Sequence, residues 1–234
     1  MNLPKIDVVI ISYAKNSECY LLTQRCLDSL MESENNSDEI FNIIVVESQE
    51  DCNWDHYQNT KTYYPEKPYG YHKFLNFGRK KGNNELVALC NNDLEFNKGW
   101  FTEIVKSMVK NPEILSFSPI CPLTQKLYGI LPNTGDLKGY EIRKHLSGWC
   151  IIQKRKIYEI IGDLDERFFH WFCDNDYSMV LQQKGIEHLL VTSSVVIHHD
   201  KNIGKTTQEV VETHEEMWRL TNGSGSIFYE KWKR

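Results

Sequence analysis

Apolar residues in this chain fall into short continuous runs that alternate with segments of helical spacing. Residues 8–12 and 41–46 are rich in β-branched side chains, which predicts two strands buried on both faces. Residues 21–31 between them place leucine and cysteine at helical spacing, which predicts an amphipathic helix. A strand, a helix and a second strand in this order predict a βαβ unit with parallel strands.

The same patterns continue to residue 198. We expect further strands at 85–90, 114–118, 146–153 and 189–198, and helices at 72–80 (stopped by Gly82), 100–110, 156–161 and 176–184. Residues 119–144 are irregular, and a helical patch covers 207–220. The chain is therefore predicted to be an α/β protein with a mostly parallel, Rossmann-like central sheet flanked by helices.

Polar residues stand where the first three predicted strands end. Ser12-Tyr13, Glu47-Ser48 and Asn91-Asn92-Asp93 follow buried runs directly. Ligands of open parallel sheets bind at the carboxyl ends of the strands. Carboxylate and amide oxygens there suit Mg²⁺ or Mn²⁺ bridged to phosphates, so Asp93 is a candidate metal ligand. A simple turn is the alternative explanation of this motif, because Asn and Asp favour turns.

Two further clusters carry candidate chemistry. Asp174 and Asp176 follow a run of aromatic residues, and apolar neighbours raise the proton affinity of a carboxylate, as acid/base catalysis requires. The alternative is that one of them only caps the following helix. His198 and His199 end the last predicted strand, where an imidazole could complete a metal site, although such histidines are often structural.

Composition narrows the class of protein. With 41% hydrophobic and 25% charged residues the chain is typical of a folded domain, and the net charge of −5 argues against a general nucleic-acid-binding surface. Short basic clusters lie at 79–81, 143–144 and 231–234. The 12% of aromatic residues is somewhat high; core packing explains most of them, and surplus aromatic rings often line sites that stack on sugars.

The cysteines and the N-terminus suggest a location. Seven cysteines occur without a C-x-x-C pair, and Cys90 and Cys150 lie in apolar runs, which predicts free buried thiols and a reducing, cytoplasmic compartment. Neither a signal peptide nor a run of membrane-spanning length is present, so an acceptor in a membrane would be reached peripherally, from the aqueous side.

Together these motifs resemble the inverting family 2 glycosyltransferases with the GT-A fold, in the family's order from residue 8 to about 207. The resemblance implies a nucleotide-diphosphate sugar as donor and Mn²⁺ or Mg²⁺ as cofactor. The segments that bind the donor in this family match the ends of the first two predicted strands, the H-K-F-L-N-F-G segment (72–78) and the N-N-D motif (91–93) of this chain. The implied donor-binding residues are Ser12, Tyr13, Glu47, Lys73, Asn76, Asn91, Asn92 and Asp93, where Glu47 replaces the family's usual Asp.

The same resemblance implies which residues catalyse sugar transfer and which bind the acceptor. Asp174 matches the catalytic base, although Cys173 replaces the first acid of the family's acidic pair, and His198 or His199 matches a late histidine that joins Asp93 at the metal. The runs 146–150 and 162–169 match acceptor-side motifs. Gly148, Trp149, Trp171 and Asp176 are the candidate acceptor-binding residues.

The expected organisation is one GT-A domain, 1–207, with a donor-binding half (1–118) and an acceptor-binding half (119–207), and a C-terminal helical tail (208–234). The expected reaction moves a sugar to an acceptor hydroxyl, of a glycan or another molecule, with inversion. A nucleotidyltransferase is disfavoured because Tyr13-Ala14-Lys15-Asn16 has no glycine after the first strand. Two alternatives stay open: the same chemistry on a nucleic-acid base, and a non-catalytic nucleotide-sugar-binding relative. Oligomeric state cannot be predicted.

Overall fold

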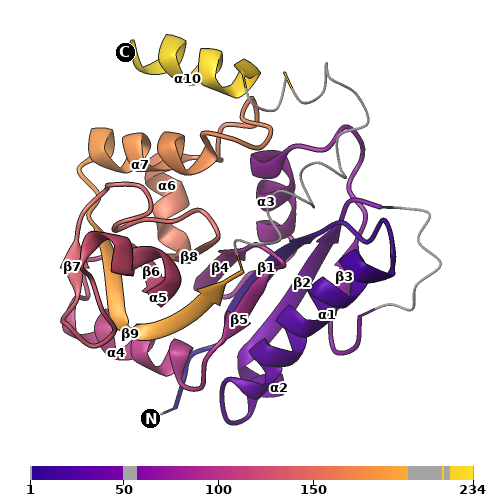
Figure 1. Cartoon of the computed structure of the whole chain (residues 1–234), viewed down its shortest axis with the longest axis vertical. Helices are drawn as coiled ribbons and strands as arrows, with labels where there is room; N and C mark the ends of the chain where they lie inside the picture. Colours follow the sequence, from indigo (N-terminus) through magenta and orange to yellow (C-terminus); the bar gives the residue numbers. More distant parts are fainter. Residues whose placement is uncertain (1, 50–56, 200–217, 219–221, 234) are drawn as a thin grey trace.

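The computed structural model describes residues 2–49, 57–199, 218 and 222–233, and it has one central sheet with helices on both sides (Figure 1). Its strands are β1 (Ile6–Ser12), β2 (Phe41–Glu47), β3 (Lys61–Tyr63), β4 (Leu86–Cys90), β5 (Leu94–Phe96), β6 (Ser116–Ile120), β7 (Leu137–Lys138), β8 (Cys150–Lys154) and β9 (His188–His198). Its helices are α1 (Ser17–Glu32), α2 (Ser37–Ile40), α3 (Tyr71–Arg79), α4 (Trp100–Lys110), α5 (Pro122–Gln125), α6 (Tyr158–Ile161), α7 (Cys173–Lys184) and α10 (Ser224–Trp232), with 3₁₀ turns η1 (Lys126–Tyr128) and η2 (Arg155–Ile157). The α/β architecture is as predicted.

The sheet has a parallel half and a mixed half. Its strand order is β3-β2-β1-β4-β8-β6-β9-β5, and β7 pairs with β9. Strands β3, β2, β1 and β4 are parallel, as the βαβ pattern predicted. Strand β8 runs antiparallel between β4 and β6, and β5 and β7 run antiparallel to β9, whereas β6 and β9 are parallel to each other.

Alternate residues of the strands feed two hydrophobic cores, one on each face of the sheet. Val8 and Ile10 of β1 pack with Leu27 of α1 and with Phe101 of α4. The intervening positions, such as Val9, pack with α3, α6 and α7. Side chains of a strand alternate between faces, so a strand that is covered on both sides is a continuous apolar run. This is why the sequence pattern marks the central strands clearly.

Glycine lets α3 approach the sheet closely. A Cβ atom at Gly78 would lie 2.4 Å from Val9 Cγ1 and 2.7 Å from Val46 Cγ2, so only glycine fits at this contact. The predicted αL stop at Gly82 is wrong, because α3 ends at Arg79 and Gly82 does not have a positive φ. Instead Gly82 makes room for the buried Asp7 carboxylate, which would lie 2.3 Å from a Cβ at this position.

Several predicted boundaries differ from the structure. The strand predicted at 146–153 begins only at Cys150, because residues 147–150 form a turn in which Cys150 N donates to Ser147 O (3.4 Å). Strands β3 and β5 were not predicted, since each has only three residues. Helix α7 begins at Cys173, three residues early, after Phe172 takes a left-handed backbone conformation (φ 63°). The helical patch predicted at 207–220 lies almost wholly outside the described residues.

Two negative findings concern the described residues only. The six cysteines among them are all free and buried, which confirms the prediction for Cys90 and Cys150. No helix in these parts of the chain combines the length and the apolar character that crossing a bilayer would require.

A buried chain of hydrogen bonds ties α7 to the mixed half of the sheet. Tyr177 of α7 and Ser116 of β6 have their hydroxyl oxygens 2.8 Å apart, and Ser116 Oγ lies 2.9 Å from His188 Nδ1. Gln153 of β8 donates to the Tyr177 hydroxyl oxygen (2.7 Å). His188 Nε2 donates to the His145 carbonyl (3.3 Å), so Nδ1 accepts from Ser116 and the ring is neutral.

This cluster predicts an acid-sensitive component of stability. Burial lowers the pKa of His188 to about 3. Below the ordinary histidine pKa of about 6.5 the unfolded chain binds a proton that the folded chain does not, so stability is lost as the pH falls from about 6.5 toward 3. The slope is about 1.4 kcal/mol per pH unit. The free energy of unfolding, measured by urea titration at pH values between 6.5 and 5, should fall less steeply with falling pH in His188→Gln than in the wild type. Equal pH dependence in the two proteins would show that His188 is not the source of the acid sensitivity.

Candidate active site

The candidate site lies along one edge of the sheet. Strands β1, β2 and β4 end there at Ser12, Glu47 and Cys90, and the antiparallel β8 begins there, because Cys90 pairs with Cys150. Strand β9 runs parallel to β6 and ends at the same edge at His198, where β5 turns back against it. The topology therefore brings Ser12, Glu47, the N-N-D motif, Trp149 and His198 to one edge, whereas Lys73 and Asn76 lie on α3 and Asp176 lies on α7.

Asp93 and His198 face each other at this edge. Asp93 Oδ1 lies 3.3 Å from His198 Nε2, and both side chains are less than 10% exposed. Asp93 Oδ1 is buried and makes no hydrogen bond within the described residues. A buried carboxylate oxygen beside an imidazole nitrogen is a donor set that fits a divalent cation, and Mn²⁺ accepts such mixed oxygen and nitrogen ligands more readily than Mg²⁺.

The two histidines of the predicted pair point to different places. The His199 side chain is half-exposed and its Nε2 lies 3.0 Å from Glu95 Oε2, while its backbone N–H donates to the Asp93 carbonyl (3.1 Å). His198 stacks on Trp149, with ring centroids 5.6 Å apart, and its backbone N–H bonds to Cys121 Sγ. Among the residues that the structure describes, no group of three His, Cys, Asp or Glu side chains could hold a metal. Asp93 and His198 are therefore only two potential ligands, fewer than a closed metal site provides.

A hydrogen-bonded network joins the ends of β1, β2 and β4. Asn92 donates to Thr23 Oγ1 (2.8 Å), whose oxygen lies 2.9 Å from Ser12 Oγ. Ser12 Oγ in turn lies 3.0 Å from the Tyr57 hydroxyl. This network orders the residues predicted to meet the nucleotide, and Thr23 and Tyr57 are members that the sequence motifs did not indicate.

Glu47 shapes the two loops beside this network. Its Oε1 accepts hydrogen bonds from the backbone N–H groups of Ala14 and Gln49, both at 2.9 Å. Its side chain is 1% exposed. In this structure Glu47 therefore fixes the backbone after β1 and after β2.

Helix α3 holds two loops in place. Asn76 is buried and exchanges two hydrogen bonds with the Leu164 backbone (2.8 and 3.0 Å), while His72 Nδ1 donates to the Asp165 carbonyl (3.0 Å). The Lys73 ammonium donates to the carbonyls of Glu66 and Pro68 (2.9 and 3.2 Å). Asn76 and Lys73, predicted to bind the donor, thus position the segments around residues 163–168 and 66–68.

Tyr71 connects the N-N-D motif to the acceptor-side segment. Its hydroxyl donates to Asn91 Oδ1 (2.7 Å) and lies 3.0 Å from the Gly148 carbonyl oxygen. Burial raises the pKa of Tyr71 well above its ordinary value, so the phenol stays protonated and remains a donor. No motif pointed to Tyr71, which lies one residue before the helix predicted at 72–80.

Asp174 lies in the first turn of α7, against Gly148. A Cβ at Gly148 would lie 3.1 Å from Asp174 Cβ, so glycine lets the loop approach the carboxyl group. Asp174 Oδ1 accepts from the Asn175 N–H (2.9 Å). Desolvation raises the pKa of Asp174 above its ordinary value, and hydrogen bonds from backbone N–H groups only partly offset this. The residue that caps α7 is Phe172, so neither acid is the helix cap.

The two tryptophans predicted to stack on an acceptor differ in exposure. Trp149 is buried beneath the site, 7% exposed, and covers the ring of His198. Trp171 is 40% exposed and packs edge-to-face against His170. Of the two, only Trp171 presents a free ring face to solvent in this structure.

Asp176 is bound by the C-terminal helix α10, which lies over α7 in Figure 1. Lys231 Nζ lies 2.8 Å from Asp176 Oδ1 and 2.9 Å from Asp165 Oδ2. The Trp232 indole N–H donates to Asp176 Oδ1 (2.9 Å). Phe228 packs on Phe172, with ring centroids 5.2 Å apart. We refer to the contacts of Lys231 and Trp232 with Asp176 and Asp165 as the α10 clasp.

The α10 clasp predicts that α10 unfolds locally when the positive charge of Lys231 is removed. Lys231→Met leaves the 2%-exposed Asp176 carboxylate without its ion pair, which costs about 2–3 kcal/mol. We expect faster amide hydrogen exchange across Ser224–Trp232 and faster proteolysis there, with the sheet unchanged. Lys233→Met, an exposed neighbour on the same turn, serves as the control. Equal exchange in both variants would show that the clasp does not hold α10.

Comparisons with known proteins agree with this architecture. No family model matches the chain. It is 24% identical over 173 residues to the O-antigen biosynthesis protein RfbC of Myxococcus xanthus, a match that covers 63% of this chain and 12% of RfbC.

Solved structures resemble the fold over most of the chain. GalNAc-T7 with UDP, GalNAc and Mn²⁺ matches with a TM-score of 0.64 at 15% identity, over 84% of this chain and 43% of that protein. The mannosyltransferase PcManGT of Pyrobaculum calidifontis with GDP-Man and Mn²⁺ matches with a TM-score of 0.63 at 13% identity, over 94% of this chain and 61% of that protein. TarS of S. aureus (residues 1–349) matches with a TM-score of 0.60 at 16% identity, over 82% of this chain and 59% of that protein.

The chain thus spans less than two thirds of each of these proteins. At sequence identities of 13–16%, the similarity to these solved structures is a similarity of fold. The arrangement of sheet and helices described above is that of the GT-A glycosyltransferases.

Proposed function

We propose that this chain is a metal-dependent glycosyltransferase that moves a sugar from a nucleotide-diphosphate donor to an acceptor hydroxyl with inversion. The observation that carries the proposal is the pair Asp93 and His198, whose facing atoms lie 3.3 Å apart at the edge where the parallel strands end. The GT-A fold supports it, since two structural relatives hold Mn²⁺ together with UDP or GDP-Man.

The donor would lie along the ends of β1, β2 and β4. The Ser12–Thr23–Asn92 network and the loops fixed by Glu47 form the surface offered to the nucleotide. Asp93 and His198 would hold Mn²⁺, which when bound neutralises charge on the diphosphate. Because two protein ligands leave most coordination positions open, donor phosphate oxygens and water would have to supply the remaining ligands.

Asp174 would act as the general base. Its carboxylate takes the proton from the acceptor hydroxyl as the oxygen attacks the anomeric carbon opposite the departing nucleoside diphosphate, so the configuration inverts. Its raised pKa suits this role, because a base is more effective as its pKa approaches the working pH. Tyr71, bonded to both Asn91 and Gly148, keeps the donor edge and the Asp174 segment in fixed relation.

A thermal-shift screen tests the proposal without knowledge of the acceptor. UDP-sugars and GDP-mannose are added with and without Mn²⁺. A donor at a hundredfold excess over its Kd raises stability by about 2.7 kcal/mol, which for a chain of this size is a rise in Tm of about 5–10 °C. We expect this rise only when donor and Mn²⁺ are both present. If no donor raises Tm beyond Mn²⁺ alone, the proposal is refuted.

A further inference from the structure

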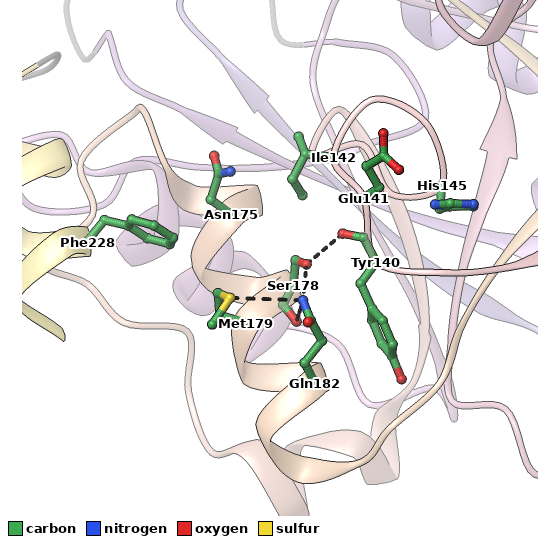
Figure 2. Close-up of a pocket in the computed structure, with 9 residues that line it drawn as sticks. All are labelled: Tyr140, Glu141, Ile142, His145, Asn175, Ser178, Met179, Gln182 and Phe228. Atoms are coloured by element: carbon green, nitrogen blue, oxygen red, sulfur yellow. Dashed lines mark hydrogen bonds between the residues drawn. The ribbon is translucent and has the colours of Figure 1, made fainter. Parts of the chain in front are cut away.

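An open pocket of about 460 Å³ lies between α7, the loop 139–146 and α10 (Figure 2). Asn175 and Gln182 mark its two ends on α7, and Tyr140 and His145 face them from the loop. Phe228 of α10 also lines the pocket and lies on the side of α7 away from Tyr140 and His145 in Figure 2. Asn175 and Gln182 are two turns apart, so the pocket extends about 10 Å along the helix axis.

One end of this pocket is lined by Asn175, the next residue along α7 after the proposed catalytic base. The backbone N–H of Asn175 donates to Asp174 Oδ1 (2.9 Å). The loop on the opposite side runs on to Gly148, which packs against Asp174. The Asn175 end of the pocket is therefore the end nearer to Asp174, which does not itself line the pocket.

The pocket wall combines aromatic rings with neutral hydrogen-bonding groups. Tyr140 and Phe228 contribute rings, and Asn175 and Gln182 contribute side-chain amides. His145 also lines the pocket, and its Nδ1 is a buried polar atom with no hydrogen-bond partner among the described residues. Burial lowers the pKa of His145, so the ring offers a neutral imidazole. Apolar faces with a few convergent polar groups are typical of binding sites for small polar molecules.

The charge of the wall does not favour a phosphate-rich ligand. Its one carboxylate, Glu141, pairs with Lys144 at 3.1 Å, and no lysine or arginine is among the described residues that line the pocket. Nucleic acids are bound chiefly by cations that contact phosphates. We infer that this pocket is an acceptor subsite for a neutral oligosaccharide; the inference rests on the proposed transferase activity and deepens it by naming the acceptor class.

Helix α10 is part of this subsite. Phe228 reaches the pocket because the α10 clasp fixes the helix to Asp176 and Asp165. Asp176 thus has a positioning role, through α10, in place of a direct contact with the acceptor.

The test is to fill the pocket at the end far from Asp174. Gln182→Trp places a large side chain in it, and Gln183→Trp places the same side chain on the exposed neighbouring position as the control. The probes are neutral maltose-, chitin- and mannan-type oligosaccharides from disaccharide to hexasaccharide, and a short single-stranded DNA. Binding is followed by saturation-transfer NMR, and donor binding by the melting shift with nucleotide sugar and Mn²⁺.

We expect at least one neutral oligosaccharide to bind wild type and Gln183→Trp alike, and Gln182→Trp to weaken it at least about tenfold. His145→Phe, a second variant that retains the shape of the ring, should weaken the same ligand. The melting shift with donor and Mn²⁺ should be unchanged in all variants. Binding of no oligosaccharide, equal binding by Gln182→Trp, or preferential binding of the DNA overturns the inference. A wild type without a donor-dependent shift would instead refute the proposed function.

Discussion

Asp174→Asn is expected to lower the rate of sugar transfer by about 10³-fold while it leaves donor affinity unchanged. Removing a general base typically costs 10²–10⁴ in rate. Asn keeps the shape of the side chain and can still accept a hydrogen bond from the Asn175 N–H, so the first turn of α7 should be retained. Transfer is measured as nucleoside diphosphate released in the presence of the acceptor, and donor affinity by calorimetry with Mn²⁺.

The pH profile adds a second readout. Because desolvation raises the pKa of Asp174, the acidic limb of the kcat profile should lie above the range of an ordinary aspartate. This limb should be absent from the residual activity of the Asn variant. Glu159→Gln, which removes an exposed carboxylate on α6, is the matched control and should behave as wild type. Turnover by Asp174→Asn within tenfold of wild type would remove Asp174 from the role of base.

Asp93→Ala is expected to abolish the part of donor affinity that depends on Mn²⁺. The substitution removes the buried carboxylate that faces His198 and leaves one nitrogen ligand, which is too few to hold the cation beside a diphosphate. We expect the gain in affinity that Mn²⁺ gives the wild type, at least about tenfold or 1.4 kcal/mol, to disappear. Calorimetric titration of the donor with and without Mn²⁺ measures this difference.

Glu95→Ala is the control for the metal site. Glu95 lies two residues away on β5, is exposed and pairs with His199, so its loss also removes one carboxylate from the same edge. The Mn²⁺ dependence should survive in this variant. If Asp93→Ala retains it as well, the cation is bound elsewhere or not at all.

The central fold was predictable because each local pattern had a single good structural solution. Strands β1, β2 and β4 are covered on both faces and are therefore continuous apolar runs. Helix α4 was predicted with both boundaries right, since Asn111-Pro112 ends an amphipathic segment there. Strands β3 and β5 depend on pairing with β2 and β9, and three residues carry no periodicity of their own.

The site was predictable to the extent that it depends on strand ends. Asp93 and His198 follow two strands that end at one edge, so their meeting could be predicted from topology. The α10 clasp could not, because Lys231 and Asp176 are 55 residues apart and nothing local marks a long-range ion pair. The same holds for Glu47, whose sequence position does not reveal that its Oε1 accepts hydrogen bonds from two backbone N–H groups.

Strand β8 lies beside β4 in the sheet, so the first half of the chain depends on the second half to cover β4. Residues 119–234 supply β8, which is the hydrogen-bonding neighbour of β4 over the five positions 86–90. A fragment that stops at residue 118 would leave the flank of β4 open, with a row of unsatisfied amide and carbonyl groups along an apolar strand. Such flanks recruit other chains, so the donor-binding half expressed alone should self-associate instead of remaining monodisperse.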